Sequence, residues 1–172
     1  MNYLTQSVAA LVLGLSASVS FAQNCISGAT PITPTSRFSL EEDLVVDKQT
    51  GLTWQRCVVG QSWNAATQNC DGLPLAKNWK NAMQDAPEGW RVPNIRELNS
   101  ITEFTCVRPT INLTVFPNAP TDFFWSSTPM VNVTDPAQAG MSAWGMFYLN
   151  GIPGGLKKDS AIYVRLVRSP AE

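Results

Sequence analysis

The pattern of apolar and polar residues predicts a β-hairpin, followed by two helices and then three strands. The hairpin joins the apolar run at 44–46 to a second β-rich run at 52–58. The polar segment between these runs ends in Gly51, which suits a turn. The aromatic run FFWSS predicts a buried strand, and a Gly/Pro-rich turn separates the last two strands. The three later strands occupy residues 123–127, 143–150 and 161–168.

Helical periodicity appears in two segments between these strands. The first is 77–86, where Trp79 and Met83 share one apolar stripe with two alanines. The second begins at Asn94, a good N-cap residue, and Glu97 stands where the acidic member of a capping box belongs. Strands and helices that are segregated along the chain are typical of α+β proteins. The sequence therefore predicts an α+β fold with a mainly antiparallel sheet.

The segment 1–22 is expected to be a signal peptide rather than part of the fold. Its apolar run at 8–17 is too short to span a bilayer and has the length of a signal-peptide core, although no Lys or Arg precedes it. Ser20 and Ala22 are the small residues that a cleavage site requires. We therefore expect an exported protein, secreted or periplasmic, that begins at Gln23 and has no transmembrane segment in the mature chain.

The composition narrows the classes of function. The chain has 12 basic and 13 acidic residues, and this balance disfavours a nucleic-acid partner, which selects a strongly basic surface. The absence of histidine excludes a Ser-His-Asp or Cys-His triad. Charged residues make up only 15% of the chain while tryptophan occurs six times, so we expect a dense core that includes Trp54, Trp90 and Trp125. Neither a cofactor nor an enzymatic activity is expected.

The chain has four cysteines, Cys25, Cys57, Cys70 and Cys106. An even number of cysteines in an exported protein predicts two disulfides, for which three pairings exist. We favour Cys57–Cys70, which closes a short polar loop, and Cys25–Cys106, which ties the N-terminal segment to the middle of the chain. A zinc site is disfavoured, because the sequence has no histidine and no C-x-x-C spacing.

Seven short features follow one another along the chain: TGLTWQRC (50–57), the Cys57–Cys70 loop with Trp63, Trp79, WRVPNIREL (90–98), INLTVFPN (111–118), FFWSS (123–127) and YVRLVR (163–168). In this order they resemble the Lcl C-terminal domain family. The resembling domain occupies 44–169, and the segment 23–43 is expected to be an extended N-terminal arm. The resemblance implies a C-type-lectin-like fold, in which two helices pack on a mainly antiparallel sheet with long loops.

The resemblance also implies an extracytoplasmic binding domain, because a bacterial adhesin of this family recognises sulfated glycosaminoglycans. This chain lacks the collagen-like repeat of that adhesin, and it lacks the Glu-Pro-Asn and Trp-Asn-Asp motifs of calcium-dependent lectins. We therefore expect an exported bacterial module that binds a glycan or surface partner without calcium. A structural component of a surface appendage is the alternative. An enzyme related to formylglycine-generating oxidases is less favoured, because disulfides account for all four cysteines.

The expected fold places the ligand-binding surface on the loop 128–142 and the adjoining turn 150–158. Polar side chains there are candidates to bind sugar hydroxyls, an aromatic ring is a candidate to contact a sugar face, and two lysines are candidates to bind an acidic group. These candidates are Asn132, Asp135, Gln138, Trp144, Tyr148, Asn150, Lys157 and Lys158. The expected partners are a glycan or a cell-surface or envelope protein.

Overall fold

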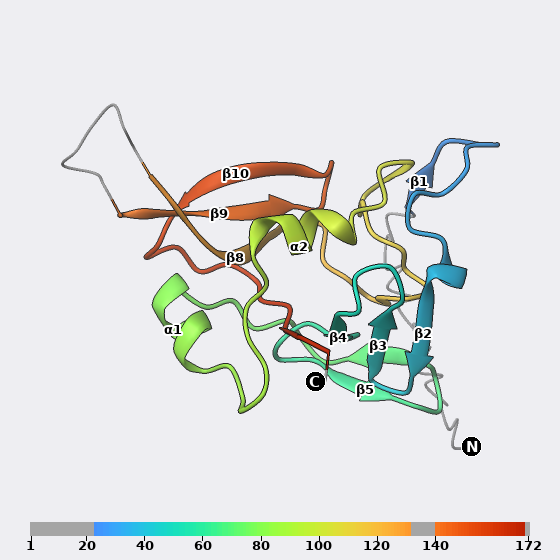
Figure 1. The fold of residues 1–172 in the computed structure, drawn as a ribbon, viewed down its shortest axis with the longest axis horizontal. Helices are drawn as coiled ribbons and strands as arrows, with labels where there is room; N and C mark the ends of the chain where they lie inside the picture. The colour runs from blue at the N-terminus through green and yellow to red at the C-terminus, as the bar shows by residue number, and fades with distance from the viewer. Residues whose placement is uncertain (1–22, 132–139, 171–172) are drawn as a thin grey trace, which may run out of the picture.

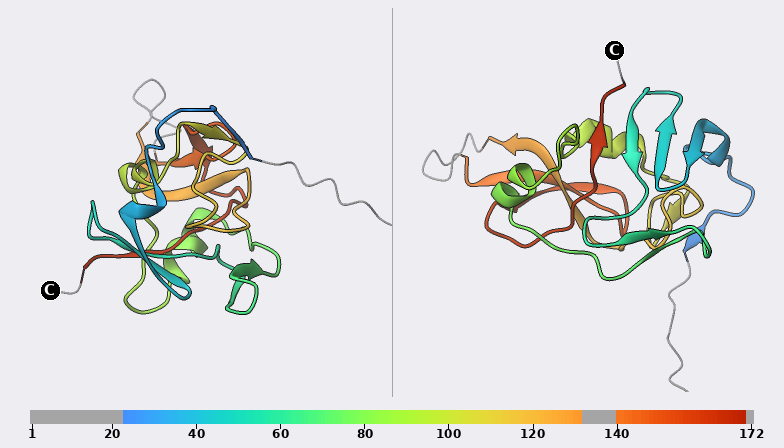
Figure 2. Two further views of the ribbon diagram at one scale, coloured as in Figure 1. Left: turned by 90° about the vertical axis from the view of Figure 1, so that its right-hand side faces the viewer. Right: turned by 90° about the horizontal axis from the view of Figure 1, so that it is seen from below.

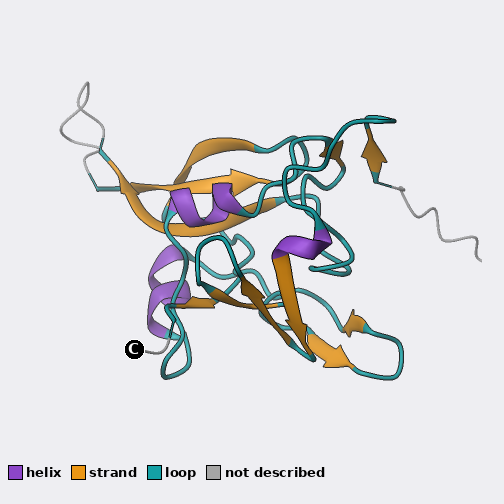
Figure 3. Cartoon of the chain, turned by 45° about the vertical axis from the view of Figure 1, so that its right-hand side comes forward, coloured by secondary structure: helices purple, strands orange, loops and turns teal. Residues whose placement is uncertain are grey.

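The computed structural model describes residues 23–131 and 140–170, and all structural statements that follow concern these residues. Strands in four sheets dominate this part of the chain, and the helices between them are short (Figures 1 and 3). Within each sheet the neighbouring strands are antiparallel.

The largest sheet has the strand order β11–β4–β3–β2, with bounds Val167–Arg168, Thr53–Gln55, Leu44–Asp47 and Phe38–Glu41. A second sheet has the order β10–β9–β8, with bounds Ile152–Lys157, Ser142–Phe147 and Phe123–Met130. The two small sheets pair β1 (Asn24–Cys25) with β7 (Cys106–Val107), and β5 (Ser62–Asn64) with β6 (Asn69–Asp71). The helices are α1 (Trp79–Gln84), α2 (Ile95–Ser100) and a 3₁₀ turn at Thr35–Arg37.

The predicted α+β fold, with two helices packed on a sheet in a C-type-lectin-like arrangement, is wrong. The described residues form eleven strands, whereas α1 and α2 have six residues each, so the protein is mainly β. The helices are short because the residues that start and stop them lie close together in the sequence. α1 begins after its N-cap Asn78 and ends at Gln84, before its C-cap Asp85 and the nearby Pro87. The periodicity at 77–86 therefore predicts a helix in the right place but makes it too long.

The predicted hairpin is confirmed as β3 and β4, but other strands lie where the pattern shows none. β10 occupies the segment that the pattern assigns to a Gly/Pro-rich turn. Its glycines allow close packing across the sheet: a Cβ on Gly155 would overlap the sulfur of Met130, and a Cβ on Gly154 would lie 3.2 Å from the Phe123 ring. Close approach of neighbouring side chains thus fixes this strand despite its low strand propensity.

Two hydrophobic clusters share strand β8. Phe124 belongs to the larger cluster, together with Trp54 of β4 and Leu98 of α2. Trp125 points to the opposite face of β8 and belongs to the second cluster. Trp54 and Trp125 are both fully buried, as predicted. Burial on both faces explains why this strand is a continuous aromatic run rather than an alternating one.

Arg165 lies inside the larger core and is fully buried. Its Nη1 donates hydrogen bonds to the carbonyl oxygens of Gln55 (3.0 Å) and Arg56 (2.6 Å). Its guanidinium carbon lies 4.6 Å from the ring centroid of Phe116 and 5.7 Å from that of Phe124. Burial lowers the pKa of Arg165 to about 10. This arginine therefore joins the C-terminal segment to β4 and contributes no charge to the surface.

The structure contains the two disulfides that the sequence favours. Cys57–Cys70 closes the loop that carries β5 and β6, and Cys25–Cys106 joins β1 to β7. Disulfides persist in oxidising compartments, so both bonds are consistent with an extracytoplasmic protein. Among the residues that the structure describes, none of the helices is both long enough and apolar enough to cross a membrane.

The N-terminal segment is also held by the buried carboxylate of Glu103. This carboxylate accepts hydrogen bonds from the backbone N–H groups of Ile32 (3.1 Å), Thr33 (2.7 Å) and Thr105 (3.1 Å). The hydroxyls of Thr33 (2.9 Å) and Thr105 (2.6 Å) donate two more. Burial alone would raise the pKa of Glu103, but these hydrogen bonds outweigh that effect and lower the pKa to about 2. Glu103 is therefore an anion at neutral pH and fastens 32–33 to the segment before β7.

Candidate functional site

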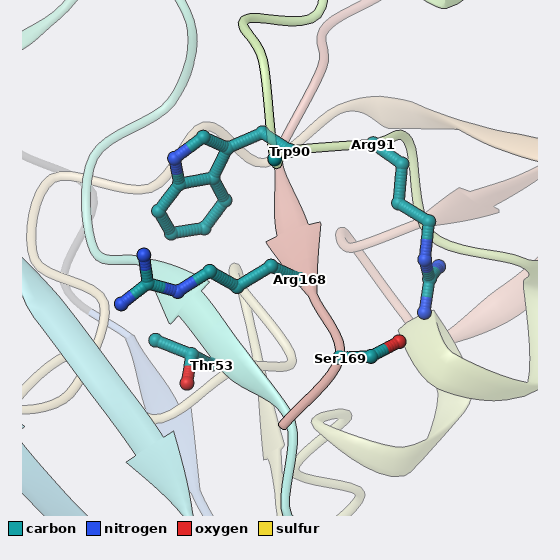
Figure 4. Close-up of a pocket in the computed structure, with 6 residues that line it drawn as sticks. Thr53, Trp90, Arg91, Arg168 and Ser169 are labelled. Atoms are coloured by element: carbon teal, nitrogen blue, oxygen red, sulfur yellow. The ribbon is translucent and has the colours of Figure 1, made fainter. Parts of the chain in front are cut away.

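An open hollow lies where β11 meets β4 and the segment that follows α1 (Figure 4). Arg168 pairs with Thr53 in the sheet, while Arg91 and Val167 form two backbone hydrogen bonds of 2.9 and 3.0 Å. This register sets Trp90 beside Arg168, so that Trp90, Arg168 and Thr53 form a row across three adjacent segments. The hollow has a volume of about 590 Å³, and its lining is Thr53, Gly89, Trp90, Arg91, Arg168 and Ser169. We call it the Trp90 hollow.

The indole of Trp90 and the guanidinium of Arg168 form the most distinctive contact in the Trp90 hollow. The turn at 87–89 positions the tryptophan, because the Trp90 N–H donates to the Pro87 carbonyl at 2.9 Å and Gly89 adopts a φ of 78°. Trp90 is half-buried and packs partly against the second hydrophobic cluster. The guanidinium carbon of Arg168 lies 5.0 Å from the ring centroid, which is within the range of a cation–π contact. Figure 4 shows the Arg168 side chain extended beneath the ring.

Arg91 extends on the other side of β11 (Figure 4). Its charge is compensated by Glu97. Two hydrogen bonds of 2.7 Å join its guanidinium to the Glu97 carboxylate, which also accepts from the Asn94 N–H at 2.7 Å. The Asn94 side chain in turn accepts from the Glu97 N–H, so the predicted capping box is confirmed. The hydrogen bonds that Arg91 donates to Glu97 raise the pKa of Arg91 above its ordinary value.

The pKa of Glu97 shifts in the opposite direction to that of Arg91. Burial alone would raise its pKa, but the hydrogen bonds from Arg91 and from the Asn94 N–H outweigh burial and lower it. Arg91 and Glu97 thus form a fixed ion pair that positions the start of α2. Arg168 is exposed and forms no ion pair with any carboxylate of residues 23–131 or 140–170. The uncompensated positive charge in the Trp90 hollow therefore belongs to Arg168.

A guanidinium beside an indole can bind two parts of one ligand. The guanidinium presents several N–H donors in one plane, which suits a carboxylate, sulfate or phosphate group. The exposed part of the indole presents an apolar surface that suits the C–H face of a sugar or another flat group. The hydroxyl groups of Thr53 and Ser169 add neutral hydrogen-bonding capacity at the same place. The Trp90 hollow thus offers a cationic group, an apolar ring and two hydroxyls at one place.

The two lysines predicted to bind a ligand lie at a second open hollow. It has a volume of about 610 Å³, and its lining is Gly140, Met141, Ser142, Lys157, Lys158 and Asp159. Lys157 is opposite Ser142 at the end of the β9–β10 pair. The Nζ atom of Lys158 lies 4.1 Å from the ring centroid of Trp79, so this ammonium already contacts an aromatic face. We call this region the lysine hollow.

The other predicted residues do not gather around the lysines. Asn150 lies in the turn before β10, whereas Lys157 is the last residue of that strand, so the length of β10 separates them. Trp144 is half-buried in β9 opposite Gly155. Tyr148 is fully buried, and its hydroxyl donates to the Leu98 carbonyl at 3.0 Å. Asn132, Asp135 and Gln138 lie outside the described residues.

Sequence reasoning misses the Trp90 hollow because the pairing that creates it is long-range. Trp90 follows a recognisable Pro-Glu-Gly turn and Arg168 ends a strand-like run, but neither pattern indicates that the two residues are neighbours. The basic residues of the C-terminal segment also lie in different parts of the structure. Arg165 is in the core, Arg168 is in the Trp90 hollow, and Lys157 is in the lysine hollow.

The part of the chain that the structure describes has no candidate metal site and no free thiol. No cluster of three or more Cys, Asp or Glu side chains could hold a metal ion there. All four cysteines are in disulfides.

Comparison with known proteins identifies one match. The family model described as the Lcl C-terminal domain matches residues 43–168. No curated protein and no solved structure matches. The matched residues include the whole lining of the lysine hollow and all of the lining of the Trp90 hollow except Ser169.

Proposed function

We propose that this chain, which belongs to the Lcl C-terminal domain family, is an exported, non-enzymatic module that binds a glycan or another partner at a cell surface. The observation that carries the proposal is the contact between Trp90 and Arg168 in an open hollow. An exposed arginine beside a half-buried tryptophan, without a carboxylate partner among the described residues, is a site prepared for an external anionic group.

The chemistry of the Trp90 hollow favours an acidic glycan over a purely charged ligand. A sugar ring contacts the indole through its C–H groups, while a sulfate or carboxylate on the same or the next sugar accepts hydrogen bonds from Arg168. Thr53 and Ser169 bind hydroxyls at the edges of the ring. None of these contacts requires a metal, so binding is independent of calcium.

Several observations support the other parts of the proposal. Both disulfides suit an oxidising compartment, as export by a signal peptide at 1–22 would provide. An oxidase of the formylglycine-generating type needs a reactive cysteine, and here every cysteine is in a disulfide. The lack of histidine removes the commonest general base.

The test is a glycan array probed with protein that begins at Gln23, followed by titration of the strongest acidic hit. We expect Arg168→Ala to weaken binding by about 10- to 100-fold, because a charge-assisted hydrogen bond contributes about 1.5–3 kcal/mol. Affinity of the unchanged protein should fall steeply with salt, and the variant should lose much of that salt dependence. A chelator should leave the affinity unchanged.

The matched control is the double variant Lys157→Ala and Lys158→Ala, which removes two positive charges from the lysine hollow. We expect it to bind the same glycan with nearly unchanged affinity. Loss of binding in the lysine variant alone would place the ligand in the lysine hollow. If both the Arg168 variant and the lysine variant bind the glycan with the affinity of the unchanged protein, neither hollow binds it and the proposal is contradicted.

A second function, assembly into a surface structure, is supported by the position of β10. This strand has six residues and forms the edge of its sheet, and none of the described strands pairs with its outer side. Edge strands of this kind can accept a strand from another chain. Pro153 removes one of the N–H donors of β10, so we rank assembly below ligand binding. Light scattering of the folded protein over a range of concentrations tests it, and a strictly monomeric protein would exclude self-assembly.

A further inference from the structure

Trp63 lies on the β5–β6 hairpin, in a part of the molecule that the proposed function does not use. It is half-buried, and its strand position is directly opposite Cys70, which forms the disulfide with Cys57. Beneath the ring lies Arg56, whose guanidinium carbon is 4.0 Å from the ring centroid. A covalent bond and a stacked side chain therefore fix this tryptophan at the surface of the protein.

Arg56 provides the support without presenting its charge to a ligand. It is 6% exposed, and each of its guanidinium nitrogens donates to a backbone carbonyl. The acceptors are Val115 (3.0 Å), Glu42 (3.0 Å) and Thr114 (2.9 Å). The same arginine therefore holds the tryptophan, the turn between β2 and β3, and the segment at 114–115 in one arrangement.

Trp63 and Glu42 form the wall between two open hollows, with volumes of about 480 and 540 Å³. Each volume lies in the range of pockets that bind small molecules. The first hollow is also lined by Asp43, Gln55, Gln61 and Ser62. The second is also lined by Leu40, Ala65, Thr67, Gln68, Leu113 and Thr114, with Arg56 behind them.

The polar side chains in these two hollows are carboxylates, amides and hydroxyls, and the only cation in their described lining is the carbonyl-bonded Arg56. Glu42 and Asp43 are exposed and form no ion pair within 23–131 or 140–170. Carboxylates and amides accept hydrogen bonds from sugar hydroxyls, and the two negative charges repel sulfated or carboxylated ligands. The chemistry at Trp63 is thus opposite in charge to that of the Trp90 hollow.

We propose that Trp63, with Glu42, Asp43 and Gln68 beside it, is a binding site for an uncharged oligosaccharide that runs across both hollows. One sugar ring stacks on the exposed part of the indole, and the sugars on either side place their hydroxyls against the polar side chains. Gln55 of the first hollow and Thr53 of the Trp90 hollow are alternate residues of β4, so their side chains lie on the same face of the large sheet. The site at Trp63 is a separate site and does not rest on the proposed function of Arg168.

The experiment titrates the protein with a panel of neutral gluco-, manno-, xylo- and galacto-oligosaccharides and with a heparin oligosaccharide. Calorimetry gives the affinity, and the change in tryptophan fluorescence reports contact with an indole. We expect at least one neutral oligosaccharide to bind with an affinity that is independent of salt. Trp63→Ala should weaken that binding about tenfold, since loss of one aromatic contact has an effect of this size.

Two further variants separate a binding role from a structural one. Trp63→Phe retains an aromatic ring over Arg56 and should recover most of the affinity, with an unchanged thermal unfolding midpoint. Glu42→Gln should retain neutral binding while increasing the affinity for the heparin oligosaccharide. Glu88→Gln, which removes a carboxylate elsewhere on the surface, is the matched control for Glu42→Gln and should leave neutral binding unchanged. The proposal is overturned if no member of the neutral panel binds, or if Trp63→Ala folds and binds as well as the original protein.

Discussion

Replacement of Glu103 by glutamine should destabilise the protein at neutral pH by roughly 3 kcal/mol. The pKa of this carboxyl falls from an ordinary value of 4.5 to about 2 in the folded protein. Each unit of difference between the pKa values in the folded and unfolded states corresponds to about 1.4 kcal/mol of stability. The glutamine side chain of the variant would lose the negative charge and turn an N–H₂ group toward donors that now have no acceptor. The five hydrogen bonds that hold 32–33 and Thr105 would be weakened together.

The sign of the pH dependence follows from the lowered pKa. A carboxyl whose pKa is lower in the folded state stabilises that state fully at pH values above its unfolded pKa. This stabilisation is therefore complete above about pH 5, and it decreases as the pH falls from 4.5 toward 2. Glutamine does not titrate, so the difference between the two proteins should be large at pH 7 and much smaller near pH 3.

Urea unfolding followed by tryptophan fluorescence measures the free energy of unfolding at each pH. Glu88→Gln is the control, because Glu88 is exposed and forms no side-chain hydrogen bond within the described residues. It should change the stability by less than about 0.5 kcal/mol. The reasoning would be refuted by a Glu103→Gln variant that loses less than about 1 kcal/mol at pH 7. Equal losses at pH 7 and pH 3 would refute it as well.

Three other outcomes are expected. Replacement of Cys57 and Cys70 by serine should lower the free energy of unfolding by about 3 kcal/mol, the value for a disulfide with a sequence separation of 13, as measured in urea without reductant. Gly145→Ala should lower the thermal midpoint by several degrees, because the new Cβ would lie 2.9 Å from the Phe124 carbonyl oxygen and would force β8 and β9 apart. The protein isolated from its natural host should have an intact mass that corresponds to a chain starting at Gln23, and a mass that includes 1–22 would contradict export by a cleaved signal peptide.

The elements that sequence predicts correctly are those determined by nearby residues. The turn before Gly51 and the capping box at Asn94 depend on side chains a few positions apart, and both occur in the structure. β10 depends instead on Phe123 and Met130, which lie over its glycines from another strand. Propensity alone assigns those glycines to a turn, so the α+β prediction undercounts the strands and the true fold is mainly β.

The candidate site is harder to predict than the fold for the same reason. Asn150 and Lys157 are close in sequence and would share a site if a turn joined them, but an extended strand holds them apart. Trp90, Arg168 and Thr53 share a hollow because three distant segments run side by side (Figure 2, right). Only the aromatic residue of this group carries a signal in the sequence, and that signal indicates core packing. A half-buried tryptophan serves the core and the surface together.

The Cys25–Cys106 disulfide determines how the domain would respond to mechanical tension. When the chain is pulled at residues 23 and 170, the force passes from Cys25 through the sulfur atoms directly to Cys106. The segment 26–105 between them is bypassed, and it includes the hairpin of Trp63, both helices and the first three strands of the large sheet. Only the segment after Cys106 can then be drawn out, beginning with the short pairing of β11 to β4. An attached protein under flow would therefore lose the Trp90 hollow first and keep the Trp63 hairpin closed.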